Sequence, residues 1–321
     1  MIVFFFFTCI SASSFYLLAA PPQDSTTSSI WWLNSSGGVA TQVWQGTIDL
    51  DSVIVDRGAE RGLATFERGI HDEMLLPLYK HGEAADASFR HGVAGRVPIE
   101  AADDIVFPLL LPANDRHTIG GIRTRMLDDD LYQQTSLVSL HQDGATVTLT
   151  ELANITDVTD LSYSLWWTSL FHLDAEWVTT LGGGNSSIGH LFAYNTKTGA
   201  TRRLPITLDG AAVPNGVQFT ALSGRNVIVG VATVNHRHAA VTLSPTTAQL
   251  TVVGLLPVDM FVVFSTAAVG DLVVFLGACG KLATPCLATA DLHTGTVAPL
   301  HVTLPPSTKT TLRDVNTVVA W

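Results

Sequence analysis

A hairpin that recurs along the chain constrains the fold more than any other feature of this sequence. Its clearest copy is GHLFAYNTKTGATRRLPITL (189–208), in which two strand-like runs flank a turn that begins with Asn and ends with Gly. Apolar residues alternate along the strands, and Asn and Gly tolerate the positive φ angles that tight turns require. Related copies occupy 135–154, 238–257 and 286–305. We therefore expect an array of repeated β-hairpins.

The spacing of these turns predicts how the repeats are arranged. The turns end at Gly144, Gly199, Ala248 and Gly295, which lie 55, 49 and 47 residues apart, and four strand-like runs belong to each turn. Four-stranded units at this period are typical of a β-propeller, in which each unit is one blade. We predict an all-β chain: a β-propeller of four-stranded antiparallel blades, with five to six blades and seven as an alternative. The final run, 314–321, is expected to close the ring by pairing with the amino-terminal blade.

One stretch, 176–205, resembles a kelch-type blade. Its first apolar strand ends in the pair Gly182-Gly183, and its second runs through Tyr194 into the polar turn. Glycine at that position allows close backbone approach near the crowded centre of a propeller. The later units keep a single glycine there, Gly230 in the third unit and Gly277 in the fourth. The tryptophan that usually follows the turn is absent throughout. The resemblance implies a kelch-like propeller and covers one blade.

The amino terminus predicts passage into the secretory pathway. Residues 1–23 contain no charged side chain and 1–10 are almost continuously apolar, as in a signal peptide that lacks the usual basic start. Cleavage after Ser14 would satisfy the preference for small residues, whereas cleavage after Ala20 would place Pro21 beside the scissile bond. About 20 apolar residues can also span a bilayer, so an uncleaved membrane anchor is the alternative.

The expected domain organisation follows from these segments. It comprises a signal peptide or N-terminal anchor at 1–20, a polar linker at 21–30 and a β-propeller domain at 31–321, in which 71–102 is irregular. In that irregular stretch, Pro77 and three glycines interrupt helix and strand alike.

Glycosylation sequons fit a secreted or cell-surface protein. Triplets of the form Asn-x-Ser/Thr begin at Asn34, Asn154 and Asn185. All three fall at predicted turns or loops, where a glycan could be accommodated. We therefore predict a glycoprotein in an extracellular location.

The cysteines agree with that compartment. Cys9 would leave with the signal peptide, so that Cys279 and Cys286 remain, on either side of a connection between two predicted antiparallel strands. Cysteines on paired strands can come within bridging distance, and an oxidising compartment favours the bond. We predict a disulfide between them, with two buried free thiols as the alternative.

The distribution of charge excludes one class of partner. The chain has 17 Lys and Arg against 28 Asp and Glu, and residues 1–180 hold 23 of the acidic side chains but nine of the basic ones. Binding to nucleic acid or to an anionic membrane requires clustered Lys and Arg. We expect no nucleic acid partner, and membrane association only through an uncleaved amino-terminal segment.

Several residues could carry chemistry, but they do not form a recognised motif. His236 and His238 share a strand face and could chelate a metal, yet no third ligand is nearby. Asp128–Asp130 lack the spacing of a calcium loop. P-loop, dinucleotide-binding and nucleophile-elbow motifs are absent from the sequence. We therefore predict no metal site and no cofactor.

Two further groups of candidates have a structural interpretation. They are three histidines spaced ten residues apart and two tryptophan pairs that could stack on sugars: His71, His81, His91, Trp31, Trp32, Trp166 and Trp167. The glycine-rich context favours exposed loops for the histidines. Adjacent residues of a strand point to opposite sides, so one tryptophan of each pair is expected in the core between blades.

Two functions therefore remain open. The favoured one is a binding module, secreted or on the cell surface, whose blade loops take a protein or a carbohydrate. The alternative is an extracellular propeller enzyme (a hydrolase, lyase or cyclase) with its site at the mouth of the central channel, for example with Asp103, Asp104 or His172. The sequence assigns no catalytic residue.

Overall fold

The computed structural model describes residues 14–321 apart from several stretches between the elements. Those stretches are 20–26, 48–51, 56–60, 68–72, 98–104, 107–108, 111–117, 128–131, 156–169, 182–188, 214–216, 224, 235 and 306–309. The described residues are predominantly in strands and include no α-helix, only the short 3-10 helices η1 (Ala84–Asp86) and η3 (Leu312–Asp314). Within this part of the chain, no helix has the length and apolar character needed to cross a membrane.

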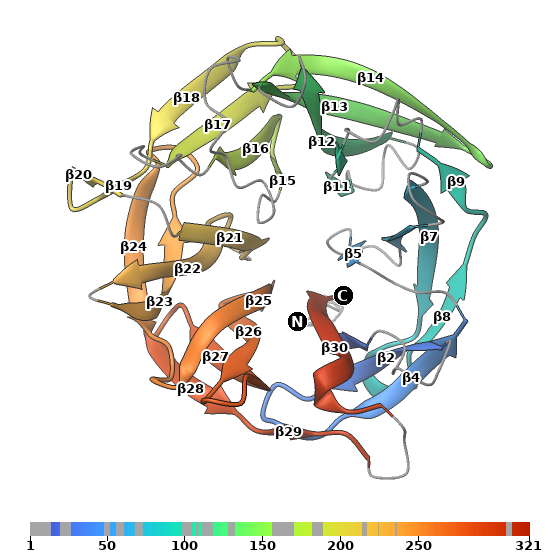
Figure 1. The fold of residues 1–321 in the computed structure, drawn as a ribbon, viewed down its shortest axis with the longest axis vertical. Helices are drawn as coiled ribbons and strands as arrows, with labels where there is room; N and C mark the ends of the chain where they lie inside the picture. The colour runs from blue at the N-terminus through green and yellow to red at the C-terminus, as the bar shows by residue number, and fades with distance from the viewer. Residues whose placement is uncertain are drawn as a thin grey trace, which may run out of the picture.

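The sheets are arranged as blades around a central axis (Figure 1). In the described part of the chain, five sheets have four or more strands, and most are four-stranded and antiparallel. The chain is thus a five-blade β-propeller, which confirms the predicted fold class. We number the blades from the amino terminus.

Blade 1 joins the two ends of the chain. Its strands, from the axis outward, are β30 (Val315–Ala320), β1 (Phe15–Ala19), β2 (Ser28–Leu33) and β4 (Thr41–Gly46). The backbone N–H of Ser14 donates to Trp321 O at 2.9 Å, and that of Trp321 donates to Ser14 O at 2.8 Å. The last strand therefore closes the ring by pairing with the amino-terminal blade, as predicted.

Strand β1 lies inside the segment that the sequence assigned to a signal peptide or anchor. All five of its residues are buried, since β1 is a central strand of blade 1. Strand β2 likewise begins within the predicted linker. Where a leader would end stays a prediction, and of the two cleavage positions considered, the one after Ser14 retains β1 whereas the one after Ala20 removes it.

Blade 2 is a double blade. Its ten strands are β5 (Ser52–Val55), β6 (Arg61–Glu67), β7 (Glu73–His81), β8 (Ser88–His91), β9 (Gly95–Arg96), β10 (Ile105–Val106), β11 (Leu109–Leu110), β12 (Thr118–Leu127), β13 (Tyr132–Asp143) and β14 (Thr146–Asn154). Two antiparallel units are joined by one parallel contact between β9 and β14. Counted as antiparallel units, the described ring has six, so the predicted range of five to six covers both counts. The stretch 71–102, expected to be irregular, contains β7, β8 and β9.

Blades 3, 4 and 5 reproduce the predicted four-strand units. Blade 3 contains β15 (Leu170–Leu173), β16 (Glu176–Leu181), β17 (His190–Asn195) and β18 (Thr201–Pro205). Blade 4 contains β21 (Val217–Leu222), β22 (Ile228–Val234), β23 (Arg237–Leu243) and β24 (Gln249–Leu255), with β19 (Thr207–Leu208) and β20 (Ala211–Ala212) at its outer edge. Blade 5 contains β25 (Met260–Val269), β26 (Leu272–Cys279), β27 (Thr284–Asp291) and β28 (Thr296–Leu300).

The recurring turns owe their shape to a side chain that caps the backbone. Asp291 Oδ1 accepts hydrogen bonds from the backbone N–H groups of Thr294 and His293, at 2.9 and 2.8 Å. Asn195 Oδ1 accepts two equivalent bonds at 3.0 Å. Local bonds of this kind satisfy the backbone of a tight turn, which explains why Asn or Asp begins it. These bonds lower the pKa of Asp291, first through Thr294 and then through His293.

Short parallel pairs protect several outer edges. The segment that leaves one unit pairs with the periphery of the next: β9 with β14, β19 with β24, and β29 (Val302–Thr303) with β3 (Gly38–Val39). An uncovered edge strand offers backbone groups that another chain could pair with. The first two contacts cover part of the edges at β14 and β24 and account for the ten-stranded and six-stranded sheets, whereas β29 and β3 form a separate two-stranded sheet.

The hydrophobic core lies between the blades. Each of the six clusters of buried side chains in the described residues is shared by neighbouring antiparallel units. For example, Trp31 of blade 1 packs in a cluster with Leu276 of blade 5. Trp31 is fully buried, and Trp32 is half-buried, which agrees with the expected place of one tryptophan in the core. Trp166 and Trp167 lie outside the described residues.

Candidate functional site

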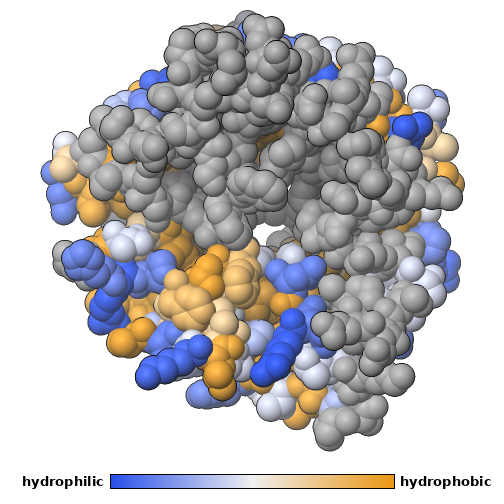
Figure 2. All heavy atoms as spheres, viewed as in Figure 1, coloured by the Kyte–Doolittle hydropathy of each residue, from blue (hydrophilic) through white to orange (hydrophobic). Residues whose placement is uncertain are grey.

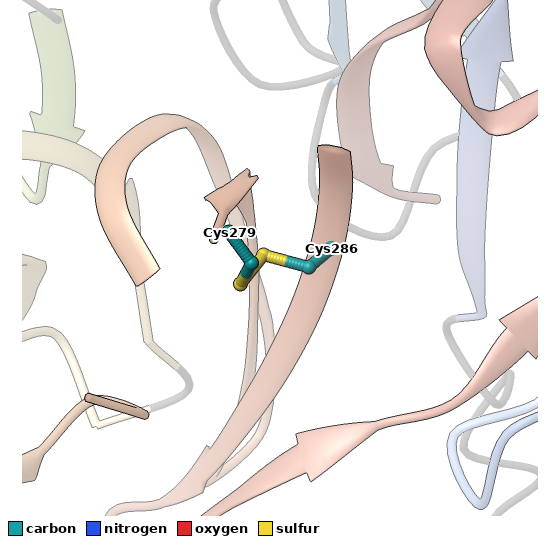
Figure 3. The surroundings of a disulfide bond; sticks show 2 residues. All are labelled: Cys279 and Cys286. Carbon is teal, nitrogen blue, oxygen red and sulfur yellow. A yellow bond between two sulfur atoms is a disulfide. The ribbon is translucent and has the colours of Figure 1, made fainter. Parts of the chain in front are cut away.

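The predicted disulfide is present. Cys279 Sγ and Cys286 Sγ are 2.01 Å apart, and the bond joins the end of β26 to the start of β27 (Figure 3). The Cα–Cα distance of 5.8 Å is typical of such a bond. The disulfide therefore fixes the end of the hairpin next to the start of β25.

The described sequons have an accessible geometry. Asn34 is exposed in the connection after β2, and Asn154 is exposed at the last residue of β14. Asn185 lies outside the described residues. Glycosylation at the three positions stays a prediction.

The candidate metal ligands are not brought together. His81 and His91 are exposed on the neighbouring strands β7 and β8, and His236 is exposed at the turn between β22 and β23. Among the residues that the structure describes, no group of three or more His, Cys, Asp or Glu side chains could hold a metal ion. His71 and Asp128–Asp130 lie outside this part of the chain.

Of the residues proposed for an enzyme, His172 can be placed. It is half-buried on β15, the strand of blade 3 nearest the axis (Figure 1). Burial lowers the pKa of His172, and the nearby carboxylate of Asp174 acts in the opposite direction. Burial thus favours the neutral form of its imidazole. Asp103 and Asp104 lie outside the described residues, so the structure does not show the convergence that the enzyme hypothesis requires.

A group of exposed apolar side chains forms the most distinctive surface in the described part of the chain. Its five members lie where blade 4 leads into blade 5, and we call them the apolar patch. They are Leu255 (44% exposed), Val258 (81%), Phe261 (51%), Phe264 (40%) and Leu282 (83%). In Figure 2, orange side chains cover the position that β25 occupies in Figure 1, with blue side chains beside them. Large apolar groups exposed together, rather than singly, indicate a contact surface.

Two β-bulges bring the phenylalanines to the surface. Along β25 the pairing with β26 passes from Met260 directly to Val262 and from Val263 directly to Ser265. Phe261 and Phe264 are thus the residues without a partner in the ladder. A bulge re-aims the side chain of the extra residue, and bulges are frequent beside functional sites.

A glycine on the neighbouring strand makes this geometry possible. Gly277 of β26 pairs with Val263, and a Cβ atom at Gly277 would overlap the carbonyl oxygen of Val262. Only a residue without a side chain allows the bulged strand to approach so closely. The sequence singled out Gly277 as the remnant of a kelch glycine pair, whereas its structural role is to accommodate the bulge.

Hydrogen bonds tie the elements of the patch to one another. Gly280 N–H donates to Asp259 O at 2.9 Å, which connects the β26–β27 turn to the segment before β25. His238 Nε2 lies 2.6 Å from Phe261 O, and since a carbonyl only accepts, the imidazole is the donor. Arg237 Nη2 donates to Leu256 O at 3.2 Å. The patch is therefore held on a fixed framework rather than on an unsupported loop.

The other end of the β25–β26 hairpin has a polar surface. Arg225 Nη2 lies 2.6 Å from Asp271 Oδ2 and 3.2 Å from His293 Nδ1, so this group joins blades 4 and 5. A similar pair, Arg202 with Glu176 at 2.6 Å, includes a bond from Arg202 to Pro245 O and joins blades 3 and 4. Ion pairs thus connect the blades at this end, whereas the apolar patch lies at the opposite end.

The sequence did not identify the patch. The run Met260–Val269 is almost wholly apolar, so it offers no alternation from which inward and outward positions could be assigned. The available signal was the single glycine of the next strand, Gly277, because an isolated glycine within a strand often accompanies a bulge.

Comparison with known proteins identifies the fold. No protein-family model and no curated protein matches the chain. Among solved structures, TolB from Acinetobacter baumannii is similar with a TM-score of 0.58 and 10% identity over 97% of this chain, which spans 66% of the length of that TolB chain. A chain from a nidogen/laminin complex is similar with a TM-score of 0.56 and 13% identity, over 96% of this chain and 98% of that one. A putative TolB from Agrobacterium tumefaciens has a TM-score of 0.50 at 10% identity, over 97% and 98%.

Similarity at such low identity concerns the fold alone. It extends over nearly all of this chain, which agrees with the ring of blades seen in Figure 1. The kelch type of the repeats stays a prediction, since Gly182 and Gly183 lie outside the described residues. By its geometry and by these comparisons, the chain is a β-propeller.

Proposed function

We propose that this chain is a protein-binding β-propeller that works outside the cytoplasm and takes its partner at the apolar patch. The observation that carries the proposal is the joint exposure of Leu255, Val258, Phe261, Phe264 and Leu282. Aromatic residues are enriched in protein interfaces, and contiguous apolar surface on a soluble protein is typical of a contact site.

The rigidity of the patch supports the same function. Phe261 and Phe264 protrude from a strand, and the disulfide and the bond from Gly280 to Asp259 hold the neighbouring turn. A surface that is fixed before binding loses little conformational entropy when a partner docks. Such a surface is suited to a specific partner.

A location outside the cytoplasm is supported by the disulfide and the amino terminus. Disulfides persist in oxidising compartments and are rare in the cytosol. The charge-free segment 1–23 and the sequons at Asn34, Asn154 and Asn185 agree with secretion or display on the cell surface. Cleavage of a signal peptide and glycosylation are part of this proposal.

A protein is favoured over a carbohydrate as the partner. Stacking on a sugar requires an exposed aromatic face, and Trp31 is fully buried with its Nε1 bonded to Ser29 Oγ at 2.8 Å. The exposed aromatic residues of the patch are phenylalanines, which have no polar group for sugar hydroxyls. A chain of similar fold in a nidogen/laminin complex is a precedent for a propeller within a protein–protein complex.

Site-directed cross-linking tests the proposal. A photoreactive amino acid replaces Val258, 81% exposed in the patch, or Val93, 63% exposed on blade 2, as the matched control. The purified, secreted protein is then irradiated in extracellular fluid from its source. We expect discrete protein adducts from position 258 that are absent from position 93 and disappear when Phe261→Ser and Phe264→Ser are added. Equal adducts at both positions, or none at 258, would contradict the proposal.

A further inference from the structure

We infer that the apolar patch takes a polypeptide segment that combines apolar side chains with carboxylates. This inference rests on the proposed function and adds the chemistry of the partner. It is carried by the ionisable residues beside the patch, whose charge differs in sign from that of the whole chain.

The charged side chains around the patch are mainly basic. Arg237 is exposed as the first residue of β23, and Lys281 is exposed in the turn that precedes β27. Asp259 is the exposed acidic residue between Val258 and Met260. The chain as a whole carries a net charge of −11. A positive local field on an acidic protein steers an acidic partner toward this place.

Arg237 is positioned to bind a carboxylate next to the apolar surface. In the described part of the chain its guanidinium makes one hydrogen bond, to Leu256 O, which is adjacent to Leu255 of the patch. A guanidinium has five N–H donors in a planar fork, so the remaining donors of this exposed side chain can hold a carboxylate. Lys281 stands directly before Leu282 in the β26–β27 turn and gives a second cation at the opposite side of β25.

These positions define a simple pattern for the partner. Arg237 and His238 are connected to the patch on the side of blade 4, through Leu256 and Phe261 respectively, whereas Lys281 lies on the side of blade 5. A segment that lies across Phe261 therefore meets a cation near each end. Apolar side chains in its centre and carboxylates toward its ends would complement this surface.

Two other occupants fit the observations less well. An anionic membrane also attracts basic and aromatic residues, but two permanent cations next to Asp259 on a chain of net charge −11 give it little attraction. A second copy of the chain bound symmetrically would bring each basic rim against itself, because a twofold interface repeats the same surface on both sides. Both are outcomes of the test.

Synthetic peptides test the inference. Three fluorescent peptides of equal length are used: one with central Leu and Phe flanked by Glu, a twin with Lys in place of Glu, and a twin with Ser in place of Leu and Phe. Fluorescence anisotropy is measured with the whole protein. We expect the acidic apolar peptide to bind about tenfold more tightly than either twin, as two exposed ion pairs and the apolar contact predict, with an affinity that falls as salt rises.

Charge variants connect the effect to the patch. Lys281→Gln and Arg237→Gln should remove most of the preference for Glu over Lys peptides. Lys197→Gln, the matched control at the tip of the exposed turn of blade 3, should leave that preference unchanged. Phe264→Ser should weaken the binding of the acidic apolar peptide and have less effect on the binding of the peptide without Leu and Phe. Equal binding of the acidic and basic peptides, or an equal effect of Lys197→Gln, would overturn the inference.

Two further measurements decide between the occupants. Binding to phosphatidylserine vesicles that Phe264→Ser abolishes would overturn the inference in favour of a membrane. A dimer in analytical ultracentrifugation that Phe264→Ser dissociates would overturn it in favour of a second copy. If Val258 cross-links to a protein while the peptides show no charge preference, the proposed function stands and this inference fails. If Val258 yields no protein adduct, the proposed function fails and this inference fails with it, even where the peptides show the charge preference.

Discussion

Gly277 decides whether Phe261 and Phe264 can reach the surface, and alanine at this position is the most direct perturbation of the candidate site. A methyl group there would overlap Val262 O and would lie 3.2 Å from the Cα atom of Val263. Both neighbours are backbone atoms, so the substitution cannot be accommodated by a side-chain rotation. The bulged part of β25 must move.

Two opposing effects set the magnitude. Overpacking of a tightly packed site costs about 1–3 kcal/mol. Alanine restricts the unfolded chain more than glycine does, and this stabilises the folded state by about 0.4–1 kcal/mol. Overpacking is the larger effect, so Gly277→Ala is expected to lower the free energy of unfolding by about 1–2 kcal/mol.

The assay combines stability with local exposure. Urea unfolding gives the change in free energy, and hydroxyl-radical footprinting with mass spectrometry gives the reactivity of Phe261 and Phe264. Gly270→Ala is the control, because Gly270 lies in the turn at the other end of the same hairpin, with φ +58° and no atom near a Cβ. Left-handed alanine costs about 1–2 kcal/mol, so this variant loses similar stability without disturbing the bulges.

The two variants should therefore differ in their hydroxyl-radical footprints. Gly277→Ala should change the reactivity of both phenylalanines, and Gly270→Ala should leave it as in the wild type. If Gly277→Ala kept full stability and an unchanged footprint, the argument that glycine accommodates the bulges would be refuted.

The remaining predictions concern stability. Reduction of the Cys279–Cys286 bond opens a loop whose ends are seven residues apart and should lower the free energy of unfolding by about 2.5 kcal/mol. Urea unfolding with and without reductant measures the loss of stability. If a variant with both cysteines replaced by serine still lost stability in reductant, the loss could not be assigned to this disulfide. The buried Lys80 Nζ donates to Trp321 O at 3.0 Å, so Lys80→Met should cost about 2 kcal/mol in thermal or urea unfolding, and unchanged stability would show that this bond does not support ring closure. The pKa of Asp291 lies below its ordinary value because backbone N–H groups of its turn favour the carboxylate. The contribution of this carboxylate to stability is therefore complete above the ordinary pKa and is lost as the pH falls through the lowered pKa. NMR titration should find the lowered pKa of Asp291, and an ordinary pKa would contradict the turn geometry.

The outward-facing side chains of the apolar patch could not be predicted from the sequence. Alternation assigns the faces of a strand only when apolar and polar residues take turns, and Met260–Val269 offers almost no polar residue. The outward direction of Phe261 and Phe264 depends on the pairing register with β26, which is a contact between strands. By contrast, the pairing of Cys279 with Cys286 could be predicted, because a short connection between two strands leaves one plausible partner.

The sequence by itself determined the repeated element. Its strands, its capped turns at Asn195 and Asp291, and their spacing depend on residues close together in the chain. The repeat also led to the expectation that the last strand returns to the first blade. The tertiary structure decided how the units join: the parallel pair of β9 with β14, the place of Phe15–Ala19 as a central strand, and the exposed patch between blades 4 and 5. The physical reason is the sequence separation of the interacting residues. Local hydrogen bonds and alternation depend on neighbouring residues, whereas edges, bulges and exposed surface depend on which distant segments pack together.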